Sequence, residues 1–180
     1  YPKTGTFYQD RLWAASTTSQ PQTLWSSVTG AWSCFSPNTL DDGIVLATSA
    51  MTVTLAEEQV NAINSIIGDT SGLIIMTSGG EWLGRGSTSQ AAITPEDMSF
   101  QKQSSFGCHA TIKPLRAGSS ILFWQRDGEV CRELTYEFGK DRFIAPNITV
   151  LSEHLTDGGI TDSAIQVGKD TKLWFLKSGG

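Results

Sequence analysis

The chain has 180 residues, of which 39% are hydrophobic and 17% are charged, and its formal net charge is −5. This composition is typical of one soluble globular domain with enough apolar residues for a core, and no stretch reaches the ~18 consecutive apolar residues of a membrane span. The acidic balance, with no cluster of Lys and Arg, argues against a general nucleic-acid binder.

A short apolar run that ends at a glycine recurs along the chain. Its four copies, at intervals of 50, 48 and 52 residues, are TLWSSVTGAW through Gly30, LIIMTSGGEW through Gly80, ILFWQRDGEV through Gly128 and LWFLKSGG through Gly180. Runs rich in Leu, Ile, Trp and Phe predict buried strands, and Gly-Gly or Asp-Gly predicts the positive φ of a two-residue hairpin turn. Each copy therefore predicts a strand, a tight turn and a second strand.

Two sets of residues are predicted to shape these hairpins. The residues expected to fix the turns are Gly30, Gly79, Gly80, Asp127 and Gly128. The tryptophans expected to pack in the core or between repeats are Trp25, Trp32, Trp82, Trp124 and Trp174. Because a β-branched residue resists positive φ, Gly80→Val is predicted to destabilise its hairpin by on the order of 1 kcal/mol or more.

A weaker echo precedes the phrase, with strand-like segments starting near Asn61, His109 and Ser163. Repeats of ~40 to 50 residues with several short antiparallel strands are typical of propeller blades. The sequence therefore predicts one all-β domain over 1–180 with antiparallel, blade-like repeats near 24–72, 73–121 and 122–172, forming part of a β-propeller. A β-sandwich is the alternative. Since the sequence starts at Tyr1 and stops within the fourth phrase, we expect it to be an excised piece of a longer chain.

Helical signals are sparse. The segment TLAEEQVNAINSII, with Thr54 as its cap, is predicted to form a short helix, and ITVLSEHL is predicted to form another. The segment ITPEDM is instead predicted to be a turn or a short helix, with Pro95 at its first position.

The sequence predicts no catalytic residue, cofactor or metal site, and hence no enzyme. Cys108 and His109 are adjacent on a predicted strand and would point to opposite faces. The acidic residues of Asp41-Asp42, Glu96-Asp97 and Asp157 show no register that brings them together. An odd number of cysteines, Cys34, Cys108 and Cys131, without CxxC spacing predicts buried free thiols in a reducing compartment.

The order of several motifs resembles the tail tubular protein B, or tail nozzle, family of short-tailed phages and related prophage proteins. The resemblance runs over about residues 5 to 156, and the elements that carry it are Arg11-Leu12, Pro21 to Trp25, Gly79 to Trp82, Gln101 to Gly107, Gly128 and the LSEHL segment from Leu151.

This resemblance implies a non-enzymatic, β-propeller-rich structural subunit of a phage or prophage tail tube. Its expected partners are identical subunits in a ring and other tail proteins, with weak DNA contact in the lumen and no membrane. The expected location is the virion tail, and the host cytoplasm during assembly. The alternative hypothesis is a propeller domain that binds or depolymerises host surface glycans, with exposed tryptophans stacking on sugar rings.

Overall fold

The computed structural model describes residues 1–37, 44–88, 91–140 and 142–179. This part of the chain is all-β and forms four antiparallel sheets that are separate in hydrogen bonding and follow one another along the sequence. Contacts divide the chain into two compact units, Tyr1–Thr77 with Glu81–Lys102, and Ser78–Gly80 with Gln103–Gly180. The predicted all-β class and its repeated antiparallel sheets are confirmed.

Three sheets are four-stranded meanders and the last is a hairpin. The first sheet contains β1 (Thr4–Tyr8), β2 (Arg11–Ala15), β3 (Thr23–Ser26) and β4 (Met51–Thr54), and lies in the first unit. The second sheet contains β5 (Ile63–Asp69), β6 (Gly72–Thr77), β7 (Gly80–Arg85) and β8 (Ser99–Ser104), and lies mostly in the first unit. The second unit contains β9 (Leu115–Ala117), β10 (Ser120–Trp124), β11 (Cys131–Glu137) and β12 (Arg142–Ile144), followed by β13 (Ile160–Gln166) and β14 (Lys172–Lys177). Within the described residues, the helical segments are a 3-10 turn, Phe138–Lys140, and α1 (Glu153–Thr156).

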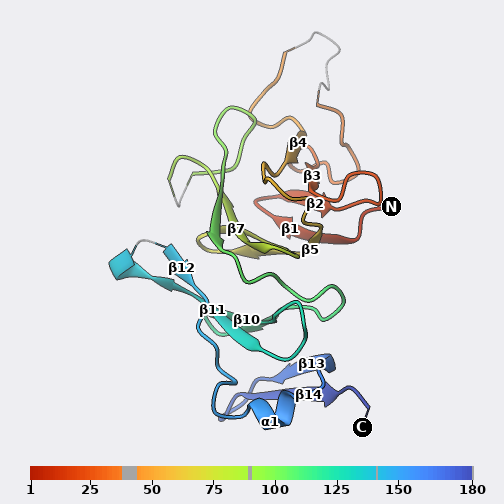
Figure 1. Ribbon diagram of the computed structural model, residues 1–180. Coiled ribbons are helices and arrows are strands. Elements are labelled where there is room, and N and C mark those ends of the chain that lie inside the picture. The colour runs from red at the N-terminus through yellow and green to blue at the C-terminus, as the bar shows by residue number, and fades with distance from the viewer. Residues whose placement is uncertain (38–43, 89–90, 141, 180) are drawn as a thin grey trace. The chain divides into compact units, whose positions relative to one another are not determined.

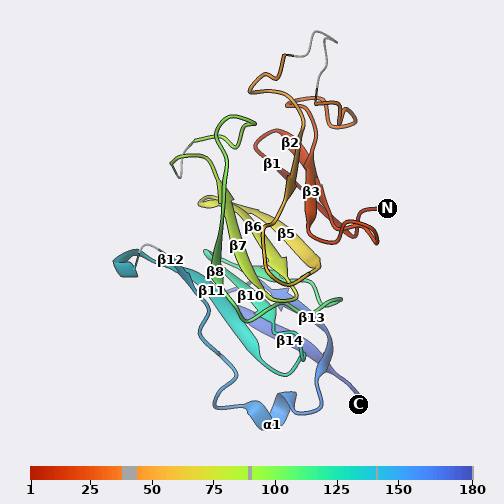
Figure 2. The same cartoon turned by 45° about the horizontal axis from the view of Figure 1, so that its top comes forward.

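One apolar core joins the two sheets of the first unit. Trp13 and Leu24 contribute to it from the first sheet, and Ile63 and Ile75 from the second. Strand β1 lies beside β5, and the glycine at position 68 makes this approach feasible, since a Cβ there would lie 2.7 Å from the Tyr8 ring. Figure 2 shows β5, β6, β7 and β8 of the second sheet side by side.

A smaller core joins the two sheets of the second unit. Trp124 and Cys131 from the third sheet pack with Ile160 of β13. The Trp124 ring meets the Phe175 ring edge to face, with centroids 5.7 Å apart, and the Ile160 amide donates to the Gly128 carbonyl at 3.0 Å. The hairpin β13–β14 is thereby fixed to the β10–β11 hairpin, and α1 precedes it in the chain (Figure 1).

The predicted repeat boundaries do not coincide with the sheets, which span 4–54, 63–104, 115–144 and 160–177. The recurring phrase marks β6, β10 and β14, each the second strand of its sheet, whereas Trp25 lies in β3, a third strand. The equivalent second strand of the first sheet is β2, with Trp13. Each predicted repeat therefore combined the end of one sheet with the start of the next.

The predicted helix in TLAEEQVNAINSII is wrong, because residues 55–62 have no regular structure and Ile63–Asp69 is strand β5. Ile63 and Ile66 are buried in the core, and β5 obtains its backbone hydrogen bonds from β6, so tertiary packing overrides a weak helical pattern. Only the end of the second predicted helix, ITVLSEHL, is helical, in the four-residue α1. In the described ranges, no helix has the length and apolar character to cross a membrane.

The predicted turn glycines take different conformations. Positive φ occurs at Gly30 (72°) and Gly128 (77°) but is not found at Gly79 or Gly80. Gly80 is the first residue of β7 and is buried, so Ser78 and Gly79 make the connection from β6. The prediction that Gly80→Val destabilises the hairpin because Gly80 has a positive φ is therefore wrong.

The turn at Asp127-Gly128 is a four-residue loop and not the predicted two-residue turn. The loop is closed by the Gln125 amide, which donates to the Val130 carbonyl at 2.8 Å. Within it, the Asp127 carboxylate accepts from the Glu129 amide at 3.0 Å, and positive φ at Gly128 lets the chain return to β11.

Candidate functional site

The five predicted packing tryptophans divide by burial. Trp82 and Trp124 lie in the cores of the first and second unit, and Trp25 is half-buried. Trp32 and Trp174 are instead 52% and 59% exposed. Two of the five tryptophans are thus available at surfaces, where an aromatic side chain offers a large contact area.

One of these surfaces is the outer face of the β13–β14 hairpin. It consists of Asp162, Ala164, Trp174 and Leu176 and is here called the β14 face. Cross-strand pairing places Ala164 opposite Trp174 and Asp162 opposite Leu176. Since side chains alternate along a strand, the neighbouring Leu173 and Phe175 pack inward. The outer face is left with Trp174 and Leu176, the latter 62% exposed.

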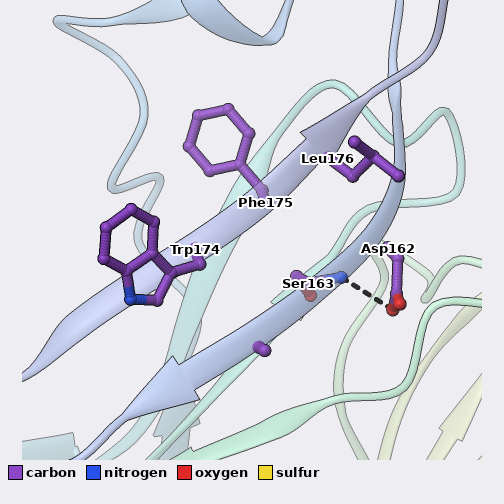
Figure 3. A pocket seen from close by; sticks show the side chains of 6 residues that line it. Asp162, Ser163, Trp174, Phe175 and Leu176 are labelled. Atoms are coloured by element: carbon purple, nitrogen blue, oxygen red, sulfur yellow. Dashed lines mark hydrogen bonds between the residues drawn. The ribbon is translucent and has the colours of Figure 1, made fainter. Parts of the chain in front are cut away.

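A shallow pocket of about 240 Å³ lies at this hairpin. It is lined by the four residues of the β14 face together with Ser163 and Phe175, and its side chains are drawn in Figure 3. The Trp174 indole Nε1 donates to the Gln166 side-chain oxygen at 3.0 Å, which fixes the orientation of the ring. The Asp162 carboxylate accepts from the Ser163 amide at 2.8 Å. This arrangement offers a flat aromatic and aliphatic surface beside one carboxylate, which suits packing against another β surface or the face of a sugar ring.

The first unit carries a second apolar patch, formed by Phe7 of β1 and Trp32. Their ring centroids are 5.3 Å apart with the planes at 71°. Trp32 follows the tight turn at Gly30, whose amide donates to the Asp10 carbonyl at 2.9 Å. This bond holds the Trp32 turn against the β1–β2 turn.

The cysteines and His109 have structural contacts. The three cysteines are free thiols, as predicted, but Cys34 is only half-buried. The Cys108 thiol donates to the His109 carbonyl, while the His109 Nδ1 accepts from the Ile112 amide at 3.2 Å. Burial raises the pKa of the Cys131 thiol to about 12, which keeps it neutral and poorly nucleophilic.

Of the acidic residues noted in the sequence, Glu96 and Asp97 lie in a turn and Asp157 follows a helix. The segment ITPEDM forms a turn in which Thr94 and Asp97 exchange backbone hydrogen bonds, and the Asp97 carboxylate accepts from the Ser87 amide at 2.7 Å. Asp157 follows α1, and Asp41-Asp42 lies outside the described residues. Among the residues that the structure describes, no group of three or more His, Cys, Asp and Glu side chains has an arrangement that would hold a metal.

Arg11 is the residue whose role the sequence did not predict. It is 2% exposed, and its guanidinium donates to the carbonyls of Ser27, Ala47 and Ser49 at 2.7–2.8 Å. These carbonyls flank the long connection between β3 and β4. The only sequence signal was a charged residue at the start of an apolar strand.

A scan against models of protein families finds no match to this chain, and a search of curated proteins finds none either.

Proposed function

We propose that the protein is a non-enzymatic structural subunit of a phage or prophage tail tube or nozzle, which assembles through its sheet faces around a channel that passes DNA. The observation that carries the proposal is the β14 face, where a two-stranded sheet exposes Trp174 and Leu176. Apolar sheet faces of this kind are stable in water when another β surface covers them. The order of motifs that resembles the tail nozzle family supports the same function.

We propose further that the four sheets are blades of a propeller. In each unit, one antiparallel meander packs against the sheet that follows it in the chain, through a shared apolar core. Blades require packing between consecutive sheets, because a single four-stranded sheet cannot bury its own faces.

The first experiment is to measure the mass of the protein in solution by light scattering, alone and with candidate tail proteins, together with negative-stain imaging. Rings, or rings that need a partner, support the proposal. Trp174→Ser is expected to reduce assembly at least tenfold, because it removes the aromatic contact area of the β14 face. Val167→Ser is the matched control, since Val167 is an exposed apolar residue in the loop of the same hairpin. A monomer that remains monomeric with every partner contradicts the proposal.

The second candidate is a domain that binds host surface glycans. It is favoured by the exposed indole of Trp174, which lines one shallow pocket together with Asp162, since sugar rings stack on aromatic faces. Addition of host polysaccharide is then expected to quench or blue-shift the tryptophan fluorescence of the protein but not of Trp174→Ser. An unchanged spectrum contradicts glycan binding and leaves the assembly proposal standing.

A further inference from the structure

An open cavity of about 560 Å³ lies in the second unit, between the residues that follow Lys102 and strand β12. Three cationic side chains line it, Arg132, Lys140 and Arg142, and the hydroxyl-bearing residues Ser104 and Ser105 line it as well. No acidic residue is part of its described lining. The described lining is therefore cationic, in a protein with a net charge of −5.

Arg132 is held in a fixed position in the wall of this cavity. Its Nε donates to the Gln125 side-chain oxygen at 3.0 Å, and its Nη1 donates to the Ala145 carbonyl at 2.7 Å. The guanidinium also lies 3.5 Å from the centroid of the Phe106 ring. Its charge is therefore positioned before any ligand arrives, which lowers the entropic cost of binding an anion.

Lys140 and Arg142 supply the adjustable part of the site. Lys140 ends the 3-10 turn and Arg142 begins β12, and both side chains are exposed. Glu137 pairs with Lys140 at 2.9 Å and lies opposite Arg142 in the β11–β12 register, so it offsets one of the three positive charges. Because an exposed pair of this kind contributes little, the Lys140 ammonium is able to turn to an incoming anion.

We propose that this cavity binds a phosphate group. The chemistry is that of known phosphate sites, in which guanidinium and ammonium groups supply charge and hydroxyls supply short hydrogen bonds. The phosphate would belong either to a small phosphorylated molecule or to a nucleic-acid backbone, and both sources present the same oxygens. This proposal is independent of the assembly function, since it concerns different residues from the β14 face.

Amide chemical-shift changes on titration with inorganic phosphate at low salt test the site directly, with chloride at equal ionic strength as the reference. We expect the largest shifts at residues 103–106 and 142–145. The double variant Lys140→Gln/Arg142→Gln, which leaves the structural Arg132 in place, is expected to weaken binding at least tenfold. Arg126→Gln is the matched control, because Arg126 is exposed but does not line the cavity. No shift in the wild type, or equal binding by the double variant, overturns the proposal.

A single-stranded oligonucleotide, followed by fluorescence anisotropy over a range of salt concentrations, distinguishes the two sources. Binding tighter than that of inorganic phosphate, lost in the double variant, assigns the site to a nucleic-acid backbone, and each phosphate contact adds a salt slope of about −0.7. Phosphate binding without oligonucleotide binding assigns it to a small phosphorylated ligand. Oligonucleotide binding that survives in the double variant, with phosphate shifts elsewhere, places the contact outside this cavity and overturns the proposal.

Discussion

Arg11 shows how one buried side chain organises an irregular part of the chain. Its three hydrogen bonds tie Ser27, Ala47 and Ser49 to the start of β2, and burial lowers its pKa. A buried guanidinium is tolerated here because the carbonyls that surround it satisfy its donors.

Replacement of Arg11 by Met is expected to lower the free energy of unfolding by about 2–4 kcal/mol, because it leaves buried carbonyls without donors. The measurement is urea unfolding followed by circular dichroism. Arg126→Met, at an exposed position in the β10–β11 loop, is expected to change stability by less than about 0.5 kcal/mol. If the Arg11 and Arg126 variants were equally stable, the hydrogen bonds of Arg11 would not be needed for the stability of the fold.

The raised pKa of Cys131 predicts that the protein loses stability at alkaline pH. Its pKa is raised from 9.0 to about 12, first by burial and then by Glu133. The folded state therefore keeps the thiol proton longer than the unfolded state, so this contribution is complete below pH 9 and is lost as the pH rises toward 12. The limiting slope for one group is ~1.4 kcal/mol per pH unit.

The test compares urea unfolding of the wild type and of Cys131→Ala at pH 8 and pH 10.5. The stability of the wild type is expected to fall more steeply between these values. Tyr8, whose pKa is raised by burial and by Asp69, acts in the same direction in both proteins, so the difference isolates the thiol. Parallel pH profiles would rule out this role for Cys131.

At the scale of single elements, the β10–β11 hairpin depends on the backbone of Gly128. Its φ is 77°, and an added Cβ would lie 3.4 Å from the Ile160 carbonyl oxygen. Gly128→Ala is therefore expected to cost about 1 kcal/mol, as strain in the loop and against β13. In Gly139→Ala, the added Cβ meets nothing within 4 Å, so thermal unfolding of this control should stay close to that of the wild type. If both variants melted at a similar temperature, the expected strain at position 128 would be contradicted.

At the scale of the whole molecule, variants of two tryptophans distinguish packing within a unit from packing between subunits. Trp124 is fully buried between the third and fourth sheets, so Trp124→Ala is expected to cost about 3–5 kcal/mol of stability. Trp174→Ala, on the exposed β14 face, is expected to cost less than about 1 kcal/mol of stability while reducing assembly. Chemical unfolding and light scattering of both variants give the two readouts. A large stability loss in the Trp174 variant would indicate that its role is internal.

The sequence by itself determined the class of the fold and its repetition. Apolar runs of strand length, separated by glycine and polar turns, leave few alternatives to short antiparallel strands, and Gly30 and Gly128 took the positive φ that their turns require. The spacing of the phrase revealed repeated sheets because β6, β10 and β14 are each the second strand of their sheet.

Only the tertiary structure decided which strand each phrase became and which tryptophans are exposed. Trp25 and Trp174 lie in similar local sequences, yet one is half-buried in a four-stranded sheet and the other lies on an open hairpin face. Burial depends on neighbouring sheets that are distant in the sequence, and the same holds for the carbonyls around Arg11 and for the conversion of an expected helix into β5. Local patterns set which element the backbone favours, whereas long-range packing sets which of its faces is covered.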